Sequence, residues 1–399
     1  MKVLHIIASA DPRSGGPIEG ILRQEAALGE HSTSMVVTLD PPDSGFLADI
    51  RVPILAFGRP GKSYRGKFIP LKYGFSIPYV LWILRNAKAY DAVIVHGLWN
   101  FSTFAASITL PFMKSVRYFV YAHGMMDPWF RGRYPIKHLF KIASWLLCEG
   151  RLLSAAKSVL FTADDERDLA RGQFPGWRYA ETVVGYGTAT PPKSSRPQGK
   201  AFADSTPGLG ERRYLLFLSR IHPKKGCDLL IEAFAALAER DPDLDLVVVG
   251  PDDTGMVPAL KARAEMLGVG RRIHWPGMLT GDAKWGAYRG AEAFILPSHQ
   301  ENFGVVVAEA LACGLPVLTT RKVNIWREVH NAGAGRVEND DLDGVKNLIA
   351  FWLNADAAQR KAMSKRAQAL FMEKFDVDFV ARRLANVIRE NGAPSSLAA

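Results

Sequence analysis

The stretch AEAFILPSHQENFGVVVAEALACGLPVLTT, residues 291–320, contains a complete unit of strand, helix and strand. AEAFILPS and LPVLTT are short apolar runs of strand length, and the segment that follows Gly304 has the length of a helix. Gly314 is a natural left-handed cap at the end of this helix, and Pro316 cannot continue the helical turn. Such a unit predicts neighbouring parallel strands joined by a helix that packs on their sheet.

Glu309 is the unusual residue of this stretch, because it lies inside a helix whose other side chains are almost all apolar. A helix without a polar face is expected to be enclosed on most sides. Burial of a carboxylate without a partner costs roughly several kcal/mol. We therefore expect a hydrogen-bonding partner for Glu309, which is either a bound ligand or a buried arginine.

The alternation of short apolar runs and segments of helical length extends through the whole chain of 399 residues. This length exceeds one ordinary core and predicts two domains. The polar, Pro- and Ser-rich residues 188–213 interrupt the pattern and are typical of a linker. Both halves are therefore predicted to be α/β domains with doubly wound parallel sheets. Ligands of such domains bind at the carboxyl ends of the strands.

Composition narrows the classes of function. The net charge of +10 favours an anionic partner, and the hydrophobic fraction of 48% is typical of a globular protein. Nucleic acid is disfavoured as that partner, because the chain has no zinc spacing, no RNA-binding signature and no basic run interleaved with aromatic residues. No stretch approaches the ~20 apolar residues needed to span a bilayer. We expect a soluble protein, or one bound to a surface.

A second informative stretch is FLSRIHPKKGCDLLIEAF, residues 217–234. A predicted strand ends at Arg220, a short loop carries Lys224 and Lys225, and Gly226 leads into an apolar-periodic helix. Cations and free amides between a strand and a helix form an anion site, although a solvated basic loop is the alternative. The early stretch SADPRSGGPIEG lacks the G-x-G-x-x-G spacing, which disfavours a nicotinamide cofactor.

Together these stretches resemble the retaining glycosyltransferases of the GT-B fold, in the large bacterial family of mannosyl-, glucosyl- and rhamnosyltransferases (family 4-like). The resemblance covers nearly the whole chain and is strongest in LSRIHPKKG, FILPSHQENFGVVVAEALACGLPVL and YAHGMMDPW. It implies two Rossmann-like domains that face each other across a cleft. We expect an N-terminal acceptor-side domain of residues 1–190, to which residues 377–399 return. A linker of residues 191–212 and a C-terminal nucleotide-sugar domain of residues 213–376 complete the chain.

The resemblance implies roles for residues of the second half. Arg220 and Lys225 would hold the donor diphosphate and neutralise charge as the leaving group departs. Glu309 would accept hydrogen bonds from the ribose hydroxyls, so that its partner would belong to the ligand and not to the chain. The donor sugar and phosphates would face Glu301 and the backbone of the three residues that follow it, Asn302, Phe303 and Gly304.

The resemblance also implies roles for residues of the first half. Gly16 would let the first loop approach the diphosphate, and His123 would reach the donor sugar, although a structural histidine is the alternative. Asp127 would help to place the acceptor. His96 and Trp99 also follow a predicted strand and could suit a sugar, and a packed loop is the alternative for both.

Neither a metal ion nor another cofactor is expected. Asp-x-Asp pairs begin at residues 241, 243, 341 and 376, but none of them follows the carboxyl end of a predicted strand. We expect the cations of Arg220 and Lys225 to take the place of a metal at the diphosphate. Residues 183–191 depart from the family pattern and receive no role.

The predicted function is transfer of a sugar from a UDP- or GDP-sugar to an acceptor hydroxyl with retention of configuration. In the mechanism that the family favours, the departing phosphate helps to deprotonate the acceptor on the front face. The resemblance implies a glycan or lipid-linked glycan acceptor, as in exopolysaccharide, O-antigen or lipopolysaccharide assembly. Two alternatives stay open, a nucleotide-sugar 2-epimerase of the same fold and a catalytically silent nucleotide- or glycan-binding component of such an assembly.

Residues 131–157 place cations among large apolar side chains, which fits an anionic inner-membrane surface. The alternative is a helix that packs on its own sheet with a basic outer face. Three widely spaced cysteines fit a reducing cytosol, so we expect a cytoplasmic protein. The basic and apolar stretch predicts that this protein is peripheral on the inner membrane. Residues 376–391 carry an apolar stripe, which predicts a helix, and the resemblance implies that this helix packs on the first domain.

Overall fold

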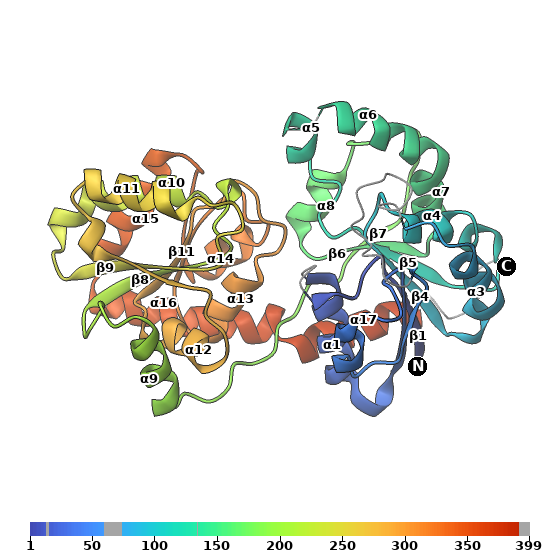
Figure 1. Ribbon diagram of the computed structural model, residues 1–399, viewed down its shortest axis with the longest axis horizontal. Coiled ribbons are helices and arrows are strands. Elements are labelled where there is room, and N and C mark those ends of the chain that lie inside the picture. Colours follow the sequence, from blue (N-terminus) through green and yellow to red (C-terminus); the bar gives the residue numbers. More distant parts are fainter. Residues whose placement is uncertain (13–15, 60–73, 134, 391–399) are drawn as a thin grey trace. The chain divides into compact units, whose positions relative to one another are not determined.

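A computed structural model describes residues 1–12, 16–59, 74–133 and 135–390 of the chain. The chain divides into two compact units. Unit 1 comprises Met1–Gly187 and the chain from Val377 onward, and unit 2 comprises Thr188–Asp376. Each unit is a parallel sheet with helices on its faces (Figure 1). The predicted fold class, two doubly wound Rossmann-like α/β domains, is confirmed.

Within the described residues, the sheet of unit 1 has seven parallel strands in the order β3-β2-β1-β4-β5-β6-β7. The order reverses between β1 and β4, which creates the switch point of a doubly wound sheet. The strands are β1 (Lys2–Ile6), β2 (Thr33–Thr38), β3 (Ile54–Ala56), β4 (Ala92–His96), β5 (Tyr118–Tyr121), β6 (Ser158–Phe161) and β7 (Glu181–Val183).

Helices cover both faces of this sheet. Because successive side chains of a strand point to opposite sides, neighbouring residues of one strand belong to different cores. Leu4 and Val95 belong to a core with α3 (Ile77–Asn86), α4 (Phe101–Ser107) and α7 (Gly150–Ala155). Val3 and Ile94 belong to a core with Leu384 of α17. The other helices of the unit are α1 (Gly16–Leu28), α5 (Trp129–Arg133), α6 (Pro135–Ser144), α8 (Asp164–Ala170) and α17 (Val377–Glu390).

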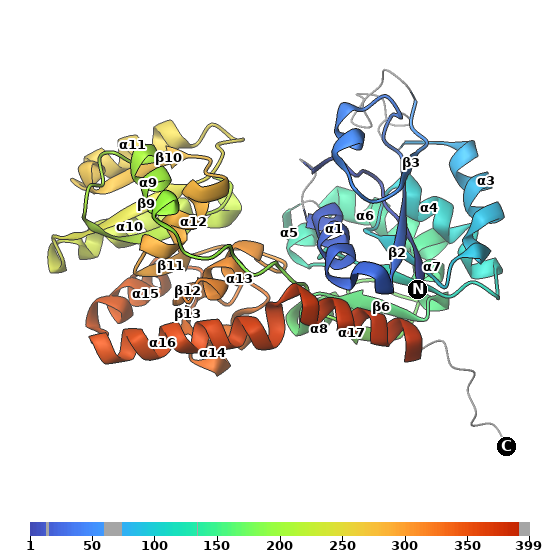
Figure 2. The ribbon, with the colours of Figure 1, turned by 90° about the horizontal axis from the view of Figure 1, so that it is seen from below.

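The helix α17 brings the end of the described chain back to unit 1 (Figure 2). It packs on the sheet through Val380, Leu384 and Ile388 and against the neighbouring helix α1. The apolar side chains of this helix recur at helical spacing, so one face is apolar and the other carries charges.

The described part of unit 2 contains a six-stranded parallel sheet in the order β10-β9-β8-β11-β12-β13, which reverses between β8 and β11. The strands are β8 (Arg213–Leu218), β9 (Leu244–Val249), β10 (Ile273–Gly277), β11 (Ala293–Leu296), β12 (Val317–Thr320) and β13 (Gly335–Glu338). The helices are α9 (Arg196–Ser205), α10 (Cys227–Leu237), α11 (Val257–Met266), α12 (Gly281–Gly290), α13 (Val305–Ala312), α14 (Trp326–Ala332), α15 (Leu342–Asn354) and α16 (Ala357–Leu370).

The helix α13 begins and ends at the residues that the sequence predicts. Gly314 adopts a left-handed backbone with φ +69°. Its N–H donates to the carbonyl of Leu311 (2.9 Å), and the N–H of Leu315 donates to the carbonyl of Ala310 (2.9 Å). These two bonds form a Schellman motif, which satisfies carbonyls at the helix end before the chain enters β12.

Three elements lie outside the predicted pattern. β7 and β13 are short edge strands that contain charged residues, so no apolar run marks them. Residues 196–205, inside the expected linker, form α9 and pack against α12. Only Gln198 and Phe202 of α9 are buried, and this sparse pattern explains why a polar, Pro-containing stretch resembles a linker.

Candidate active site

The loops after β8 and β11 pack together at the switch point of unit 2. The N–H of His299 donates to the carbonyl of Lys224 (2.7 Å), and the Lys224 ammonium donates to Oε1 of Gln300 (3.2 Å). Lys224 and Gln300 lie 76 positions apart in the chain. The two stretches that carry the strongest sequence signals therefore form one surface at the carboxyl ends of neighbouring strands, which is where doubly wound sheets bind ligands.

Lys225 and Glu301 form an ion pair at the centre of this surface. Lys225 is buried and lies in a short 3-10 turn, Pro223–Lys225. The backbone of Glu301 is held on its other side, because its N–H donates to the carbonyl of Lys322 (2.9 Å) and its carbonyl accepts from the N–H of Asn324 (3.1 Å). Two residues expected to contact the donor thus neutralise each other.

The loop after β8 carries three cations, of which Arg220 is exposed. The Arg220 side chain forms no ion pair or hydrogen bond with another described residue. Burial, followed by the charges of Lys224, Arg220 and Lys225, lowers the pKa of His222 below its usual range. Nδ1 of the same ring accepts from the N–H of Lys224 (3.1 Å) and caps the turn. An anion such as a diphosphate would be stabilised at this loop.

The residues after Glu301 lead into the N-terminus of α13. Asn302 accepts a hydrogen bond from the side chain of Asn324 (3.3 Å). The Phe303 ring is buried edge-on against Phe375, with ring centroids 5.5 Å apart. Gly304 caps the helix with φ +78°. The first amides of a helix lack partners within it, so the backbone of this segment, and not the Phe303 ring, is suited to a donor phosphate.

Glu309 has partners within the chain, so the expectation that its partner belongs only to the ligand is wrong. Its Oε1 accepts from the Lys284 ammonium (2.9 Å), and its Oε2 accepts from the Tyr288 hydroxyl (3.1 Å). The ion pair is made with a lysine of α12 and not with the buried arginine that the alternative named. A carboxylate can accept about four hydrogen bonds, so a ribose role stays a prediction beside this structural one.

His123 and Trp99 have strained backbones in unit 1. His123 follows β5 with φ +50°, and Trp99 follows β4 with φ +62°. They are the only described residues other than glycine with a positive φ. Such strain in a non-glycine residue tends to concentrate at functional sites. Both residues are site candidates from the sequence, and the backbone geometry is an independent reason to keep them.

His123 and His96 belong to a row of histidines. Nε2 of His123 lies 3.0 Å from Nδ1 of His96, and Nε2 of His96 lies 3.0 Å from Nδ1 of His5. His96 is buried, and both of its ring nitrogens are engaged. The structure therefore leaves His96 no free nitrogen for the acceptor contact that was one of its two possible roles, and it agrees with the packed-loop alternative. His5 was missed, and its only signal is a polar residue inside the apolar run VLHII.

The remaining candidates of unit 1 are held by local contacts. The Trp99 ring lies 5.1 Å from the Phe174 ring and 5.4 Å from the Lys141 ammonium, which matches the packed-loop alternative. Asp127 accepts from the N–H of Trp129 (2.8 Å). Gly16 is the first residue of α1, and a Cβ there would make only ordinary contact with the nearest side chain, a tyrosine. Their proposed ligand contacts stay predictions.

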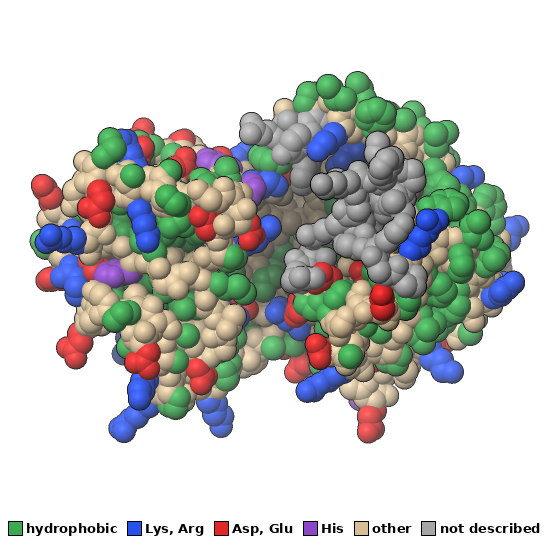
Figure 3. All heavy atoms as spheres, in the orientation of Figure 1, with side chains coloured by type: hydrophobic (Ala, Val, Ile, Leu, Met, Phe, Trp, Pro, Cys, Tyr) green, Lys and Arg blue, Asp and Glu red, His purple; other side chains and the backbone are tan. Residues whose placement is uncertain are grey.

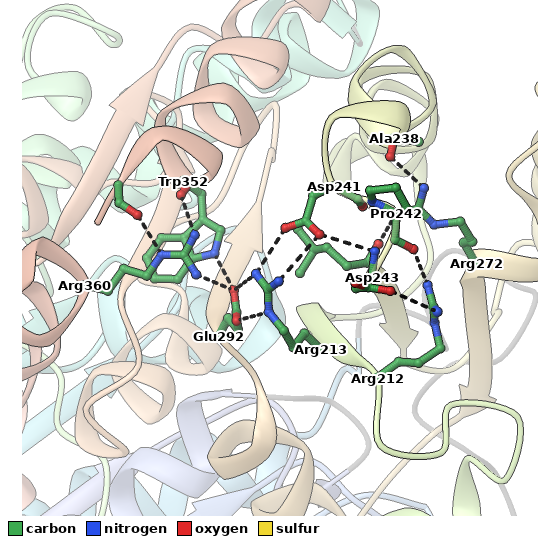
Figure 4. A network of polar contacts seen from close by, with 12 residues as sticks. Arg212, Arg213, Ala238, Asp241, Pro242, Asp243, Arg272, Glu292, Trp352 and Arg360 are labelled. Carbon is green, nitrogen blue, oxygen red and sulfur yellow. Dashed lines mark hydrogen bonds and ion pairs between the residues drawn. The ribbon is translucent and has the colours of Figure 1, made fainter. Parts of the chain in front are cut away.

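The amino ends of the unit 2 strands carry a second cluster of charges (Figure 4). Glu292, before β11, accepts from Arg213, Trp352 and Arg360. Asp245, in β9, accepts from Arg212 (2.8 Å) and pairs with His274 (2.8 Å). The aspartates of residues 241–245 therefore face arginine and histidine side chains. Among the described residues, no group of three or more metal-ligating side chains is found.

Large apolar side chains are exposed on α6, on the helical turn after it (Trp145–Glu149) and at Phe112, and we name these side chains the α6 patch. Phe140 is 74% exposed and Leu147 is 71% exposed. Figure 3 shows hydrophobic side chains gathered where α6 and α7 lie in Figure 1. Members of the patch are Phe112, Ile136, Leu139, Phe140, Leu146 and Leu147. No described helix has both the length and the apolar character needed to cross a bilayer.

Comparisons with known proteins agree with this geometry. A family model of glycosyl transferases group 1 matches residues 202–370, and a model of a glycosyl transferase 4-like domain matches residues 15–187. The crystal structure of Anabaena HepE in complex with UDP superimposes with a TM-score of 0.75 at 19% identity. The superposition covers 98% of this chain and all of that one, which shows the shared GT-B fold.

Relatives at higher identity match over shorter spans. D-inositol 3-phosphate glycosyltransferase of Salinispora tropica is 33% identical over 208 residues, 50% of this chain and 43% of that protein. Mannosylfructose-phosphate synthase of Agrobacterium fabrum is 33% identical over 142 residues, 33% of this chain and 31% of that protein. The chain thus spans less than half the length of either relative.

Proposed function

The chain belongs to the group 1 glycosyltransferases, family 4 of the GT-B fold, and on this premise we propose that it transfers a sugar from a nucleotide-sugar to an acceptor hydroxyl with retention of configuration. The observation that carries the proposal is the surface after β8 and β11. There an exposed arginine and the ion pair of the buried Lys225 with the partly exposed Glu301 lie at the end of the sheet where ligands bind.

We assign the donor diphosphate to Arg220 and Lys225. Positive charge placed where negative charge develops lowers the barrier of the reaction, because it stabilises the transition state, in which the departing diphosphate gains charge, more than the intact donor. Glu301 and the amides around Gly304 would hold the donor sugar and phosphates, and Glu309 would add a bond to the ribose. For Gly16, His123 and Asp127 of unit 1 we propose the donor and acceptor contacts that the resemblance implies. No role is assigned to a metal ion.

A uridine nucleotide is the first donor to test. HepE of Anabaena, which shares the fold, is solved with UDP and with UDP-glucose. A thermal-shift panel of UDP, GDP, ADP and dTDP identifies the base, because a ligand at a hundred times its dissociation constant adds about 2.7 kcal/mol of stability. Stabilisation by one nucleotide, lost in Arg220→Ala, is expected. No shift with any of the four would overturn the donor assignment.

Turnover assays distinguish the proposed transferase from the two alternative functions. Release of nucleoside diphosphate that depends on an added acceptor supports a transferase. Conversion of the donor sugar without acceptor supports a nucleotide-sugar 2-epimerase. Nucleotide binding without turnover on any acceptor supports a silent binding component. The acceptor panel includes lipid-linked glycans, which the resemblance favours, and sugar or cyclitol phosphates, which the names of the two relatives favour.

We propose further that the α6 patch binds an anionic membrane surface on the cytoplasmic side, where a lipid-linked acceptor is found. Large apolar side chains exposed beside cations are typical of helices that lie in the headgroup region. Lys137 is exposed on α6 itself, and the Arg151 guanidinium lies 5.2 Å from the exposed Phe112 ring. The cations would attract acidic lipid before the apolar side chains insert.

Co-sedimentation with vesicles tests this surface. Binding to vesicles with acidic phosphatidylglycerol should exceed binding to neutral phosphatidylcholine, and it should weaken as salt is added. The double variant Leu139→Ser/Phe140→Ser should lose binding. Its matched control is Met266→Ser/Met278→Ser, which removes exposed apolar side chains of unit 2. Equal binding of both variants to acidic vesicles, or no binding of the unaltered protein at low salt, would contradict the membrane role of the α6 patch.

A further inference from the structure

We propose that a row of hydrogen-bonded side chains across the sheet of unit 1 fixes the tautomer of His123, so that its Nδ1 accepts a hydrogen bond from a hydroxyl of the donor sugar. The proposal rests on the donor-site role of His123 given above. The row begins on helix α1, and its members are Glu25, Ser34, His5, His96 and His123.

The row takes one side chain from each of four neighbouring strands or their ends. Ser34 lies in β2, His5 in β1 and His96 at the end of β4, and His123 comes just after β5. These strands are adjacent in the order β2-β1-β4-β5, so the row crosses the switch point of the sheet. Each link is within hydrogen-bond distance, 3.3 Å from Ser34 to His5 and 3.0 Å at both histidine pairs.

Glu25 sets the direction of the first bond. Its Oε1 accepts from the backbone N–H of Ser34 (3.0 Å), and its Oε2 accepts from the Ser34 hydroxyl. An ionised carboxylate has no proton to donate, so the Ser34 hydroxyl must donate to Glu25. The hydroxyl oxygen can then only accept from His5, which places the His5 proton on Nε2.

A neutral imidazole has one N–H, which donates, and one bare nitrogen, which accepts. Once the donor nitrogen of His5 is known, the donor and acceptor at each later link of the row are therefore fixed. Nδ1 of His5 accepts from Nε2–H of His96, and Nδ1 of His96 accepts from Nε2–H of His123. Nδ1 of His123 is left as an acceptor. It forms no hydrogen bond with another residue that the structure describes.

Burial keeps the three rings neutral. It lowers the pKa of His5 to about 3 and that of His123 to about 4. Burial, and then repulsion from the two neighbouring rings, holds the pKa of His96 well below its usual range. The rings of His96 and His123 also stack on Tyr121, with centroids 5.9 Å and 5.2 Å away. These rings therefore stay in place with one proton each at neutral pH.

One isosteric change should reverse the whole row. In Glu25→Gln the side-chain oxygen still has to accept from the N–H of Ser34, so the new amide N–H₂ faces the Ser34 hydroxyl oxygen. The hydroxyl then donates to His5, and each histidine moves its proton to Nδ1. His123 would present a donor in place of an acceptor, although no atom near the sugar has been replaced.

Nitrogen NMR of the full-length protein labelled with ¹⁵N-histidine reads the tautomers directly, without ligand or turnover. We expect Nε2-protonated signals for His5, His96 and His123, assigned by single His→Gln variants. Glu25→Gln should convert the signals of His96 and His123 to the Nδ1-protonated form. Glu19→Gln, on the same helix α1 but outside the row, should leave them unchanged. An Nδ1-protonated His123 in the unaltered protein, or no response to Glu25→Gln, would overturn the proposal.

Steady-state kinetics test whether the tautomer of His123 affects its contact with the donor sugar. Glu25→Gln should lower kcat/KM for the nucleotide-sugar about tenfold, the effect of one hydrogen bond. It should leave the affinity for the free nucleoside diphosphate unchanged, because that ligand carries no sugar. Ser158→Ala, which removes a buried strand hydroxyl of the same sheet, controls for general damage. Reversed tautomers with unchanged kcat/KM would show that His123 does not contact the sugar, whereas an inactive protein with the expected NMR signals would contradict only the proposed function.

Discussion

The two ends of the unit 2 sheet carry similar charges but differ in how those charges are paired. At the amino ends, Glu292 accepts from two arginines and a tryptophan, and Asp245 is bonded to Arg212 and His274. At the carboxyl ends, Lys225 is the only described cation that pairs with Glu301, and Arg220 has no described partner. We call the amino ends the closed end, because their charges are paired with one another and contribute to stability. We call the carboxyl ends the open end, because charge there is left for a ligand. The difference between the two ends can be tested by substitutions at each.

The largest expected effect follows from Lys225→Ala at the open end. Turnover at saturating donor should fall about a hundred- to a thousandfold, because the charge that meets the departing diphosphate is removed. Steady-state kinetics measure it. Lys224→Ala is the matched control, since it removes an ammonium of the same loop that donates to the neutral Gln300 (3.2 Å) and not to Glu301. Equal losses in the two variants would mean that the loop needs positive charge in general, and not at Lys225.

Asp245→Asn should damage the closed end. Although burial alone would raise it, bonds from His274 and Arg212 hold the pKa of Asp245 below its usual value. A loss of about 2–3 kcal/mol in the free energy of unfolding is expected, with nucleotide affinity unchanged. Urea unfolding measures the change, and the exposed Asp243→Asn is the control. Weakened nucleotide binding in Asp245→Asn would contradict the separation of the two ends.

Glu309 lies between these cases, because it has partners in the chain and a predicted ligand. Glu309→Gln should weaken nucleotide affinity about ten- to a hundredfold and lower the melting temperature, since charge-assisted bonds are worth about 1.5–3 kcal/mol. Lys284→Met removes the ion pair but keeps the carboxylate, so it should lower the melting temperature and spare affinity. Equal melting shifts with unchanged affinity in both variants would leave Glu309 a purely structural residue.

The smallest effect is that of one neutral histidine of unit 1 on the pH dependence of stability. The pKa values of His5, His96 and His123 are lowered in the folded chain, so below about pH 6.5 the unfolded chain binds protons that the folded chain does not. Stability should therefore fall as the pH drops from about 6.5 towards 4, by at most about 1.4 kcal/mol per pH unit for each histidine. Urea unfolding at pH 7, 6 and 5 should give a shallower slope for His5→Gln than for the control, exposed His31→Gln. Identical slopes would contradict the burial of a neutral His5.

Much of the open end is predictable from the sequence, because its residues cluster in two short stretches. Arg220 and Lys225 lie in one loop, and Glu301 to Gly304 lie in another. The predicted strands that precede these loops are confirmed as β8 and β11, and their adjacency places both loops at one edge. Local pattern and strand order are sufficient here.

Long-range pairings are not predictable in this way. Lys284 of α12 meets Glu309 of α13 only through the tertiary fold, and nothing near Lys284 in the sequence marks it as the partner. The row from Glu25 to His123 depends on the register of four strands, whose members are scattered over the first 123 residues. The edge strands β7 and β13 are not predictable for a different reason, because a short strand with charged residues contains no apolar run.

The return of α17 to unit 1 has a consequence for synthesis on the ribosome. Val3, Ile94, Phe119 and Leu160 of the first sheet are covered by this helix, which is made only after all of unit 2. While unit 2 emerges, one apolar face of unit 1 is therefore left without its cover, and a chaperone or transient contacts must shield it. Unit 2, in contrast, is continuous in sequence and can complete its core before the chain ends. The unit that is translated first is thus the last to be finished.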